Sequence, residues 1–502
     1  MLEIRDLQIT FYDREVEERV VHDFHLKMTA GEKIGIVGES GSGKTMTAWS
    51  IGGLSKRKEM DKSGVILFND TDLLTCSRDA LRKIQGSQIG IIFQEPMNSL
   101  NPVHRIGKQI EESLLLHTNL TKKERYERTI EVMGAVELRN PEQLYHAYPH
   151  ELSGGMRQRV MIAAAMVHQP QLLIADEPTT ALDVTVQEQI LELLDTINQT
   201  YGTSILFISH DLSVVRRLCD RVIVMKDGTI VEEGPAGQLF EAPRHAYTQE
   251  LIDAIPKCNR IPRKLSSKVV LTVESLSVAY EKKSELTCSK ISFTLRQGEI
   301  LGILGESGSG KTTLAKALVG ILPAHSGSII RTSHTIQMIF QDPAMSLNPI
   351  RTIGWILEEP LKIKGGFTKR ERYDKVIVML QRVGLEECHV TCLPSQLSGG
   401  QRQRVAIALS LMLEPDLIVA DEPVSALDVT IQAQIIQLLL SLQKEYGMSV
   451  ILIAHDLRIV YQMCDTVLVM KDGLVVEQGN IGDVYHNPKT SYMKQLLQAQ
   501  FD

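Results

Sequence analysis

Two glycine-rich segments of the chain have the residue types and spacing that bind nucleotide phosphates. The sequence GESGSGKT occupies residues 38–45 and recurs at 305–312, each time after an apolar run and before a helical pattern. Glycines let backbone N–H groups turn toward a phosphate, and the following helix start adds positive potential. A chance glycine-rich turn explains one such match poorly and two not at all. The residues expected to bind nucleotide here are Gly38, Ser40, Gly41, Ser42, Gly43, Lys44, Thr45, Gly305, Ser307, Gly308, Ser309, Gly310, Lys311 and Thr312.

Acidic pairs supply the metal and water chemistry that phosphoryl transfer needs. Asp176-Glu177 and Asp421-Glu422 each follow an apolar run. The aspartate can reach Mg²⁺, together with the hydroxyl of Thr45, and the glutamate can polarise the attacking water. Such a pair on its own more often caps a helix or lies in a solvated turn. Its place after a phosphate loop favours the catalytic role.

A second glycine motif, LSGG, occurs at residues 152–155 and 397–400. Each copy precedes a helical run, at 157–168 and 402–413. A serine at a helix start is usually an N-cap. Here two glycines follow it and expose backbone N–H groups, which makes an anion site.

The chain is a duplication. Ser153 and Ser398, like the two Asp-Glu pairs, are 245 positions apart, which is too long a period for a solenoid repeat. The first copy is about twenty residues longer between its loop and Gln94, because Lys44 to Gln94 spans 50 positions and Lys311 to Gln341 spans 30. We expect one domain at 1–240, a tail and linker at 241–268, and a second domain at 269–502.

The elements that must position these motifs are short apolar strands. KIGIV and EILGIL lead into the phosphate loops, and further apolar runs lead into the Asp-Glu pairs and into two histidines, His210 and His455. Continuous apolar strands separated by helical segments predict a parallel sheet covered on both faces, with ligands at the carboxyl ends of the strands. The fold class is therefore α/β.

Composition excludes several classes of protein. The 502 residues are 43% hydrophobic and 23% charged, which is ordinary globular usage. With 54 basic and 61 acidic residues the net charge is -7, so no nucleic-acid partner is expected. There is no membrane-spanning stretch and no secretory signal pattern. Seven scattered cysteines suit a reducing compartment, and Cys388 and Cys392, with His389 between them, are interpreted as ordinary thiols.

Together these motifs resemble the ATP-binding cassette (ABC) family, here as two fused cassettes, over nearly the whole chain. The resemblance implies P-loop ATPase domains, each with a mainly parallel sheet, an antiparallel β subdomain and a helical signature subdomain. It also implies D-loop residues Asp183 and Asp428, and adenine-stacking rings at Phe11, or its neighbour Tyr12, and Tyr280. The implied Mg²⁺ ligands are Thr45, Gln94, Asp176, Thr312, Gln341 and Asp421. The implied catalytic residues are Glu177, Glu422, His210, His455, Gln94 and Gln341.

In this family two cassettes pair head to tail, so that each ATP lies between one phosphate loop and the other copy's LSGG motif. The resemblance thus implies two composite sites and pairing of the halves within the chain. Both sites retain the full polar set, so both are expected to be competent, although Met156 stands where glutamine is commoner. The signature residues expected at the ATP are Ser153, Gly155, Ser398, Gly400 and Gln401.

The segments QEPMNSLNP, from Gln94, and QDPAMSLNP, from Gln341, resemble those of oligopeptide, dipeptide and nickel importers. RHAYTQELIDAIPK, at 244–257, resembles the tail of the same subfamily, and the second half ends similarly from Tyr492. Cys258 stands alone in the tail, so no iron–sulfur cluster is expected. This likeness implies two permease subunits, an extracytoplasmic binding protein and a place on the cytoplasmic face of the membrane. The cargo stays open between peptide, nickel, metallophore and glutathione.

The competing interpretation is a soluble twin-cassette ATPase that acts on ribosomes or DNA. Such proteins usually carry a long charged linker or coiled-coil insertions, and this chain has neither. An exporter ATPase is a third interpretation, disfavoured by the importer-like segments.

Overall fold

The computed structural model describes residues 1–13, 16–54, 60–94, 99–180, 182–256, 263, 265–279, 286–332, 335–425 and 427–501. The chain divides into two compact units, drawn mostly from Met1–Ala254 and from Ile255 onward. Two residues of the sequence analysis, Cys258 and Tyr280, lie outside the described part, as do residues 95–98 of the first importer-like segment.

The first unit is built on a sheet of six strands and a smaller antiparallel sheet. The six-stranded sheet has the order β10 (Thr229–Pro235), β9 (Arg221–Lys226), β3 (Lys33–Val37), β8 (Ser204–Ile208), β7 (Leu172–Asp176) and β6 (Ile89–Ile92). All neighbours are parallel except β9 and β10. The antiparallel sheet has the order β2 (Val16–Met28), β1 (Leu2–Asp13), β4 (Met60–Phe68) and β5 (Thr71–Asp72).

The second unit repeats this plan. Its six-stranded sheet has the order β15 (Ile336–Ile339), β16 (Leu417–Asp421), β17 (Ser449–Ile453), β13 (Ile300–Leu304), β18 (Thr466–Lys471) and β19 (Leu474–Asn480). Its antiparallel sheet has the order β12 (Cys288–Arg296), β11 (Val269–Val278) and β14 (Ser326–Arg331). The predicted α/β class with mainly parallel sheets is confirmed in both units.

Helices surround each sheet. Those of the first unit are α1 (Lys44–Ile51), α2 (Arg78–Ile84), α4 (Ile106–His117), α5 (Lys122–Ala135), α6 (Pro141–Tyr145), α7 (Gly154–Met166), α8 (Val184–Tyr201), α9 (Leu212–Leu218), α10 (Ala236–Glu241) and α11 (Ala246–Asp253), with a 3₁₀ turn at Pro149–Glu151. Those of the second unit are α12 (Lys311–Val319), α13 (Pro343–Ser346), α14 (Ile353–Lys364), α15 (Lys369–Arg382), α16 (Gly399–Leu411), α17 (Val429–Tyr446), α18 (Leu457–Met463), α19 (Ile481–His486) and α20 (Ser491–Phe501), with 3₁₀ turns at Glu387–Thr391 and Pro394–Gln396.

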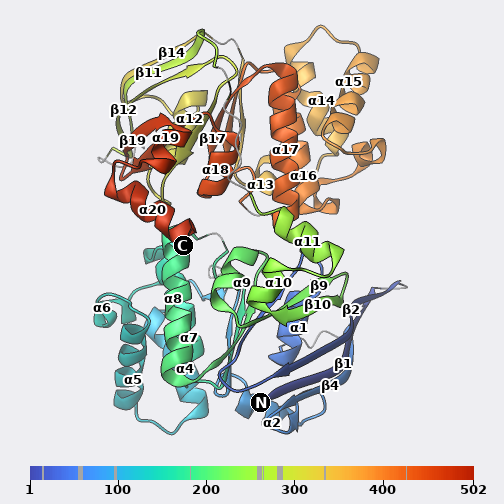
Figure 1. Ribbon diagram of the computed structural model, residues 1–502, viewed down its shortest axis with the longest axis vertical. Helices are drawn as coiled ribbons and strands as arrows, with labels where there is room; N and C mark the ends of the chain where they lie inside the picture. The colour runs from blue at the N-terminus through green and yellow to red at the C-terminus, as the bar shows by residue number, and fades with distance from the viewer. Residues whose placement is uncertain are drawn as a thin grey trace. The chain divides into compact units, whose positions relative to one another are not determined.

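Within each unit the helical segment and the antiparallel sheet lie on different sides of the central sheet. In the first unit α4, α5 and α6 gather away from β1, β2 and β4, and in the second α14 and α15 stand away from β11, β12 and β14 (Figure 1). The central strands β3, β7 and β8 are apolar and almost completely buried. Such strands form a rigid platform, and the loops at their carboxyl ends carry the candidate site.

The extra residues of the first half form β5 and α2. In the first unit β4 is followed by β5, α2 and then β6, whereas in the second unit β14 is followed by β15 across a short connection. Leu81 and Ile84 of α2 are buried in the core under the antiparallel sheet. β5 is the edge strand of its sheet, so the length difference lies outside the strands that carry the motifs, which are equivalent in both units.

Candidate active site

The first phosphate loop joins β3 to α1 and holds its lysine folded back onto the loop. Lys44 is buried, and its Nζ donates to the carbonyl oxygens of Gly38 at 2.7 Å and Glu39 at 2.8 Å. Burial lowers the pKa of the Lys44 ammonium, and the negative charge of Glu177 opposes that shift. The loop thus holds a buried cation against its own backbone at the start of α1, where phosphate binding requires positive charge.

Glycine is required at the first position of the loop. Gly38 has a φ of 152°, and a Cβ there would lie 2.2 Å from the carbonyl oxygen of Met225, at the end of β9. In the second unit Gly305 has a φ of 154°, and its Cβ would lie 2.3 Å from the carbonyl oxygen of Met470. Real Cβ atoms do not approach a backbone oxygen so closely, so each loop packs directly against the neighbouring strand end.

The residues beside the loop fit a divalent cation. Thr45 Oγ1 donates to Asp176 Oδ1 at 3.1 Å, which brings together two of the expected Mg²⁺ ligands. Asp176 Oδ2 is buried with no hydrogen-bond partner among the described residues. Burial raises the pKa of Asp176 to about 6, because nothing close by compensates fully for its charge. A buried carboxylate oxygen with a hydroxyl beside it is the donor set that Mg²⁺ prefers.

Three side chains converge on Glu177. Its Oε2 accepts a hydrogen bond from Gln94 Nε2 at 2.9 Å and one from Thr180 Oγ1 at 2.9 Å, and His210 Nδ1 lies 3.1 Å away. Burial raises the pKa of Glu177, but His210, Thr180 and the charge of Lys44 together outweigh burial and leave the pKa below the ordinary value. Burial likewise lowers the pKa of His210, and Glu177 reverses the shift, so the pKa of His210 is raised.

The backbone at the glutamate is strained. Glu177 has a φ of 47°, in the left-handed region that L-residues other than glycine seldom adopt. Its N–H donates to the carbonyl oxygen of Ile208 at 2.9 Å, which ties the residue to the end of β8. Glu422 has the same φ of 47°, and its N–H donates to Ile453 at 3.0 Å. Strain of this kind concentrates at functional positions, where it aims a side chain.

The second unit builds the same cluster from equivalent residues. Lys311 Nζ donates to the carbonyl oxygens of Gly305 at 2.7 Å and Glu306 at 2.9 Å, and Thr312 Oγ1 donates to Asp421 Oδ1 at 3.3 Å. Burial raises the pKa of Asp421 as well.

The carboxylate contacts around the second glutamate are similar but longer on the histidine side. Gln341 Nε2 donates to Glu422 Oε2 at 2.8 Å, and His455 Nδ1 lies 3.6 Å from the same oxygen. In the adjoining phosphate loop, Ser309 Oγ is buried with no partner among the described residues, which leaves a hydroxyl for a phosphate oxygen.

The LSGG motifs form helix starts, and the helices begin earlier than the sequence suggested. Ser153 caps α7, and both following glycines belong to its first turn. Ser398 caps α16 in the same way. A Cβ on Gly155 would lie 2.6 Å from Val186 of α8, and one on Gly400 would lie 2.7 Å from Ile431 of α17. Glycine is therefore needed so that these helices can pack closely.

The two helix starts differ at their fourth residue. Gln401 Oε1 accepts a hydrogen bond from the Ser398 N–H at 2.9 Å while Ser398 Oγ accepts the Gln401 N–H at 3.3 Å, which completes a capping box. In the first unit Ser153 Oγ accepts the Met156 N–H at 3.3 Å, and the thioether returns no such bond.

The structure gathers most of the predicted residues but not all of them. The loop residues, Asp176, Glu177, Gln94 and His210 form one cluster in the first unit. In the described part of the chain, Ser153 makes its hydrogen bonds within the start of α7 and none to the phosphate loop of its own unit. Phe11 lies on β1 and is partly buried against the core of the antiparallel sheet, whereas its neighbour Tyr12 is 47% exposed.

Sequence reasoning missed two kinds of contact. Thr180, which donates to Glu177, was not singled out, although its spacing of three residues from the glutamate is a turn signal. The two tail tyrosines, Tyr247 and Tyr492, contact the phosphate loops through their hydroxyl groups. They are 245 positions apart, the same offset as the catalytic motifs, and that offset could have found them.

Comparison with known families agrees with this geometry. The family model described as ABC transporter matches residues 21–180 and 288–425, one match in each half. The chain belongs to the ABC transporter family. Each half is therefore one cassette, and the expected ATPase activity follows from membership. A second model, described as oligopeptide/dipeptide transporter, C-terminal region, matches residues 231–274.

Related cassette proteins align along the whole chain. The peptidoglycan transport ATP-binding protein YejF of Agrobacterium fabrum is 43% identical over 528 aligned residues, covering 100% of this chain and 96% of that protein. The glutathione import ATP-binding protein GsiA of Escherichia coli O157:H7 is 38% identical, covering 99% of this chain and 89% of that protein. The chain is thus an ATP-binding and ATP-hydrolysing subunit of the oligopeptide/dipeptide import class of ABC transporters.

A solved structure shares the fold. The structure titled RNase-L Inhibitor superposes with a TM-score of 0.65 at 22% identity, covering 94% of this chain and 90% of that one. Identity this low shows the fold alone.

None of the described helices combines the length and apolarity needed to cross a bilayer.

Proposed function

We propose that this twin-cassette chain works on the cytoplasmic face of a membrane, where it drives two permease subunits by hydrolysing ATP at two composite sites. The matched oligopeptide/dipeptide C-terminal region and the complete set of loop lysine, aspartate, glutamate, glutamine and histidine in each cassette carry this proposal. The site residues, the domain limits at 1–240, 241–268 and 269–502, and the head-to-tail pairing of the cassettes are parts of it.

Hydrolysis in each cassette relies on positioning more than on covalent chemistry. Lys44 and the loop N–H groups would hold the β- and γ-phosphates, and Glu177 would orient and polarise the attacking water. His210, held against Glu177, would contact the γ-phosphate. Bound Mg²⁺ would supply charge neutralisation at the phosphates, and Thr45, Asp176 and Gln94 are placed to hold it. Lys311, Glu422 and His455 would do the same work in the second cassette.

The two ATP sites would each need both cassettes. We propose that Ser398, Gly400 and Gln401 complete the first site and that Ser153 and Gly155 complete the second. Serine hydroxyls and helix-start N–H groups are anion ligands, and among the described residues Ser153 and Ser398 bond only within their own helix starts. ATP would then hold the cassettes together, and hydrolysis would release them, so that chemistry is coupled to motion.

The permease subunits would dock beside the glutamines that follow β6 and β15. Gln94 and Gln341 link this region to the catalytic glutamates through hydrogen bonds of 2.9 Å and 2.8 Å. An extracytoplasmic binding protein would deliver the cargo to the permease. Relatives named for peptidoglycan transport and for glutathione import support a small peptide-like cargo, which the cassettes themselves would not touch.

Co-purification from membranes tests the proposal. The tagged chain, expressed with its neighbouring permease genes, should be extracted in detergent together with two membrane-spanning proteins and should hydrolyse ATP. A Glu177→Gln, Glu422→Gln double variant should still bring down the permease and lose turnover. Recovery of ribosomes in place of the permease would overturn the transport role and favour the soluble twin-cassette alternative.

A further inference from the structure

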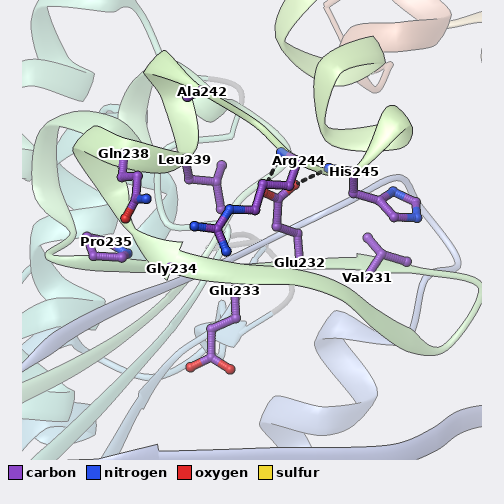
Figure 2. A pocket seen from close by; sticks show the side chains of 10 residues that line it. All are labelled: Val231, Glu232, Glu233, Gly234, Pro235, Gln238, Leu239, Ala242, Arg244 and His245. Atoms are coloured by element: carbon purple, nitrogen blue, oxygen red, sulfur yellow. Dashed lines mark hydrogen bonds between the residues drawn. The ribbon is translucent and has the colours of Figure 1, made fainter.

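The segment that follows each cassette ends in a helix, α11 or α20, whose start is fixed by a glutamate of the sheet. Glu232 of β10 accepts the backbone N–H groups of Arg244 at 2.8 Å and His245 at 3.0 Å, just before α11 (Figure 2). Glu477 of β19 accepts the N–H groups of Lys489 at 2.9 Å and Thr490 at 3.0 Å, just before α20. The anchor is duplicated with the cassettes.

From this anchor each helix sends one tyrosine to its own phosphate loop. The Tyr247 hydroxyl oxygen accepts the backbone N–H of Glu39 at 3.1 Å, and the Tyr492 hydroxyl oxygen accepts that of Glu306 at 3.1 Å. Both tyrosines are buried. Glu39 and Glu306 are the second residues of the loops, directly after the glycines that press against β9 and β18.

A lysine at the same strand end completes the contact. Lys226 Nζ lies 4.5 Å from the centre of the Tyr247 ring, and Lys471 Nζ lies 4.8 Å from that of Tyr492. Burial raises the pKa of each tyrosine to about 12, so each side chain is a neutral phenol whose oxygen accepts the loop N–H. Each tyrosine thus contacts two partners: its hydroxyl group contacts the phosphate loop, and its ring contacts the lysine at the end of the neighbouring strand.

We propose that the tail helix of each cassette positions the phosphate loop of that cassette, with Tyr247 and Tyr492 as the positioning residues. A loop rich in glycine loses much conformational freedom when it closes on phosphate. Fixing its second residue beforehand reduces the ordering that ATP must bring about, and preorganisation of this kind raises affinity. The inference rests on the proposed role of the two loops in binding ATP.

The duplication gives the inference an internal comparison. Residues 231–274, which contain Glu232 and Tyr247, match the C-terminal region of oligopeptide/dipeptide transporters. The second-half residues Glu477 and Tyr492 lie outside that match and nevertheless make the same contacts. The tyrosine contact is therefore found with both phosphate loops, and not only in the half that matches the C-terminal region of oligopeptide/dipeptide transporters.

Tyrosine-to-phenylalanine variants of the full chain test this, because they remove the hydroxyl and keep the ring. In Tyr247→Phe, hydrogen exchange without nucleotide should quicken at residues 38–44 and stay unchanged at 305–311, and Tyr492→Phe should show the reverse. The double variant should raise the KM for ATP about two- to tenfold, the range expected for one hydrogen bond per loop, with a smaller change in kcat.

Tyr373→Phe is the matched control, since Tyr373 is exposed and its hydroxyl donates to Glu387 at 3.0 Å on the surface. Its exchange and KM should equal those of the parent chain. Unchanged exchange at both loops in the tail variants would overturn the inference, as would an unchanged KM. A chain that lacked ATPase activity altogether would count against the proposed function, while the exchange measurement would still decide the role of the tyrosines.

Discussion

The side-chain amide of Gln94 donates a hydrogen bond to the carboxylate of Glu177 at 2.9 Å. The proposed permease contact and the proposed catalytic base are thus joined directly. A shift of Gln94 on permease docking would remove one of the three contacts on Glu177 Oε2 and leave those of Thr180 and His210 in place. That is a short route from the transport partner to the catalytic carboxylate.

The first prediction concerns the two glutamates. Glu177→Gln and Glu422→Gln should each reduce ATP turnover, and the double variant should fall by about 100-fold or more, because an amide cannot act as a general base. Steady-state phosphate release at saturating ATP measures this. Glu127→Gln, on the exposed face of α5, is the control and should retain full turnover. A single variant with undiminished turnover would show that its cassette does not hydrolyse ATP.

The second prediction concerns the incomplete capping box at α7. Met156→Gln should let the side chain accept the Ser153 N–H, as Gln401 does for Ser398. The expected gain is about 0.5–1 kcal/mol in the free energy of unfolding, or a rise of about 1–4 °C in Tm. The reverse change, Gln401→Met, should lower Tm by a similar amount. If Met156→Gln melts below the parent chain, the capping argument fails.

The third prediction concerns the loop that carries His455. Gln500 of α20 accepts the Leu457 N–H at 2.7 Å and donates to Asp456 Oδ1 at 2.6 Å. The equivalent residue of the first half, 245 positions earlier, is Ile255, which has no side-chain amide and so cannot make these two hydrogen bonds.

Gln500→Ala should therefore impair the second cassette and spare the first. In a Glu177→Gln background the added change should lower the remaining turnover, and in a Glu422→Gln background it should have little effect. Equal losses in both backgrounds would show that Gln500 acts on the whole chain.

The fourth prediction concerns the buried carboxylate of the first helical segment. Glu111 accepts hydrogen bonds from Lys108 at 2.6 Å, Tyr145 at 2.7 Å and Arg125 at 3.1 Å. Burial raises the pKa of Glu111, but these partners outweigh burial and leave it below the ordinary value of 4.5. Glu111→Gln should cost about 3 kcal/mol at neutral pH, because it leaves two cations without their shared partner.

The same variant has a pH signature. Since the pKa of Glu111 is lower in the folded chain than in the unfolded one, its stabilisation is complete above pH 4.5 and declines as the pH falls through the folded pKa. Denaturant unfolding at several pH values should show a shallower acid dependence in Glu111→Gln. The exposed neighbour Glu112 gives the control, Glu112→Gln, which should keep the slope of the parent chain.

Local sequence signals predicted the platform of each site well. The strand KIGIV, the glycine loop and the helix from Lys44 are contiguous, so their spacing alone defines the turn that holds the phosphates. The buried strands β7 and β8 were also predictable, because a run of at least four apolar residues in a parallel sheet is buried on both faces.

Contacts between distant segments were not predictable in this way. Tyr247 meets Glu39 across 208 positions, and nothing in the tail sequence says which way its ring points. The start of α7 was misplaced because glycine is a poor helix former, and the cap from Ser153 together with close packing against Val186 overrides that tendency. Phe11 illustrates the same limit, since a strand residue can face the core or a ligand, and its adenine-stacking role remains a prediction.

The close backbone packing at Gly38 and Gly305 limits which substitutions the protein can accept at these two positions. The obstacle at each is a backbone oxygen of the adjoining strand, 2.2 Å or 2.3 Å from where a Cβ would stand, and it exists whether or not nucleotide is bound. Alanine at either position would disturb folding as well as turnover. Cellular proteases would then degrade such variants and lower the amount of the protein. Natural selection would therefore retain both glycines because they maintain protein abundance as well as transport.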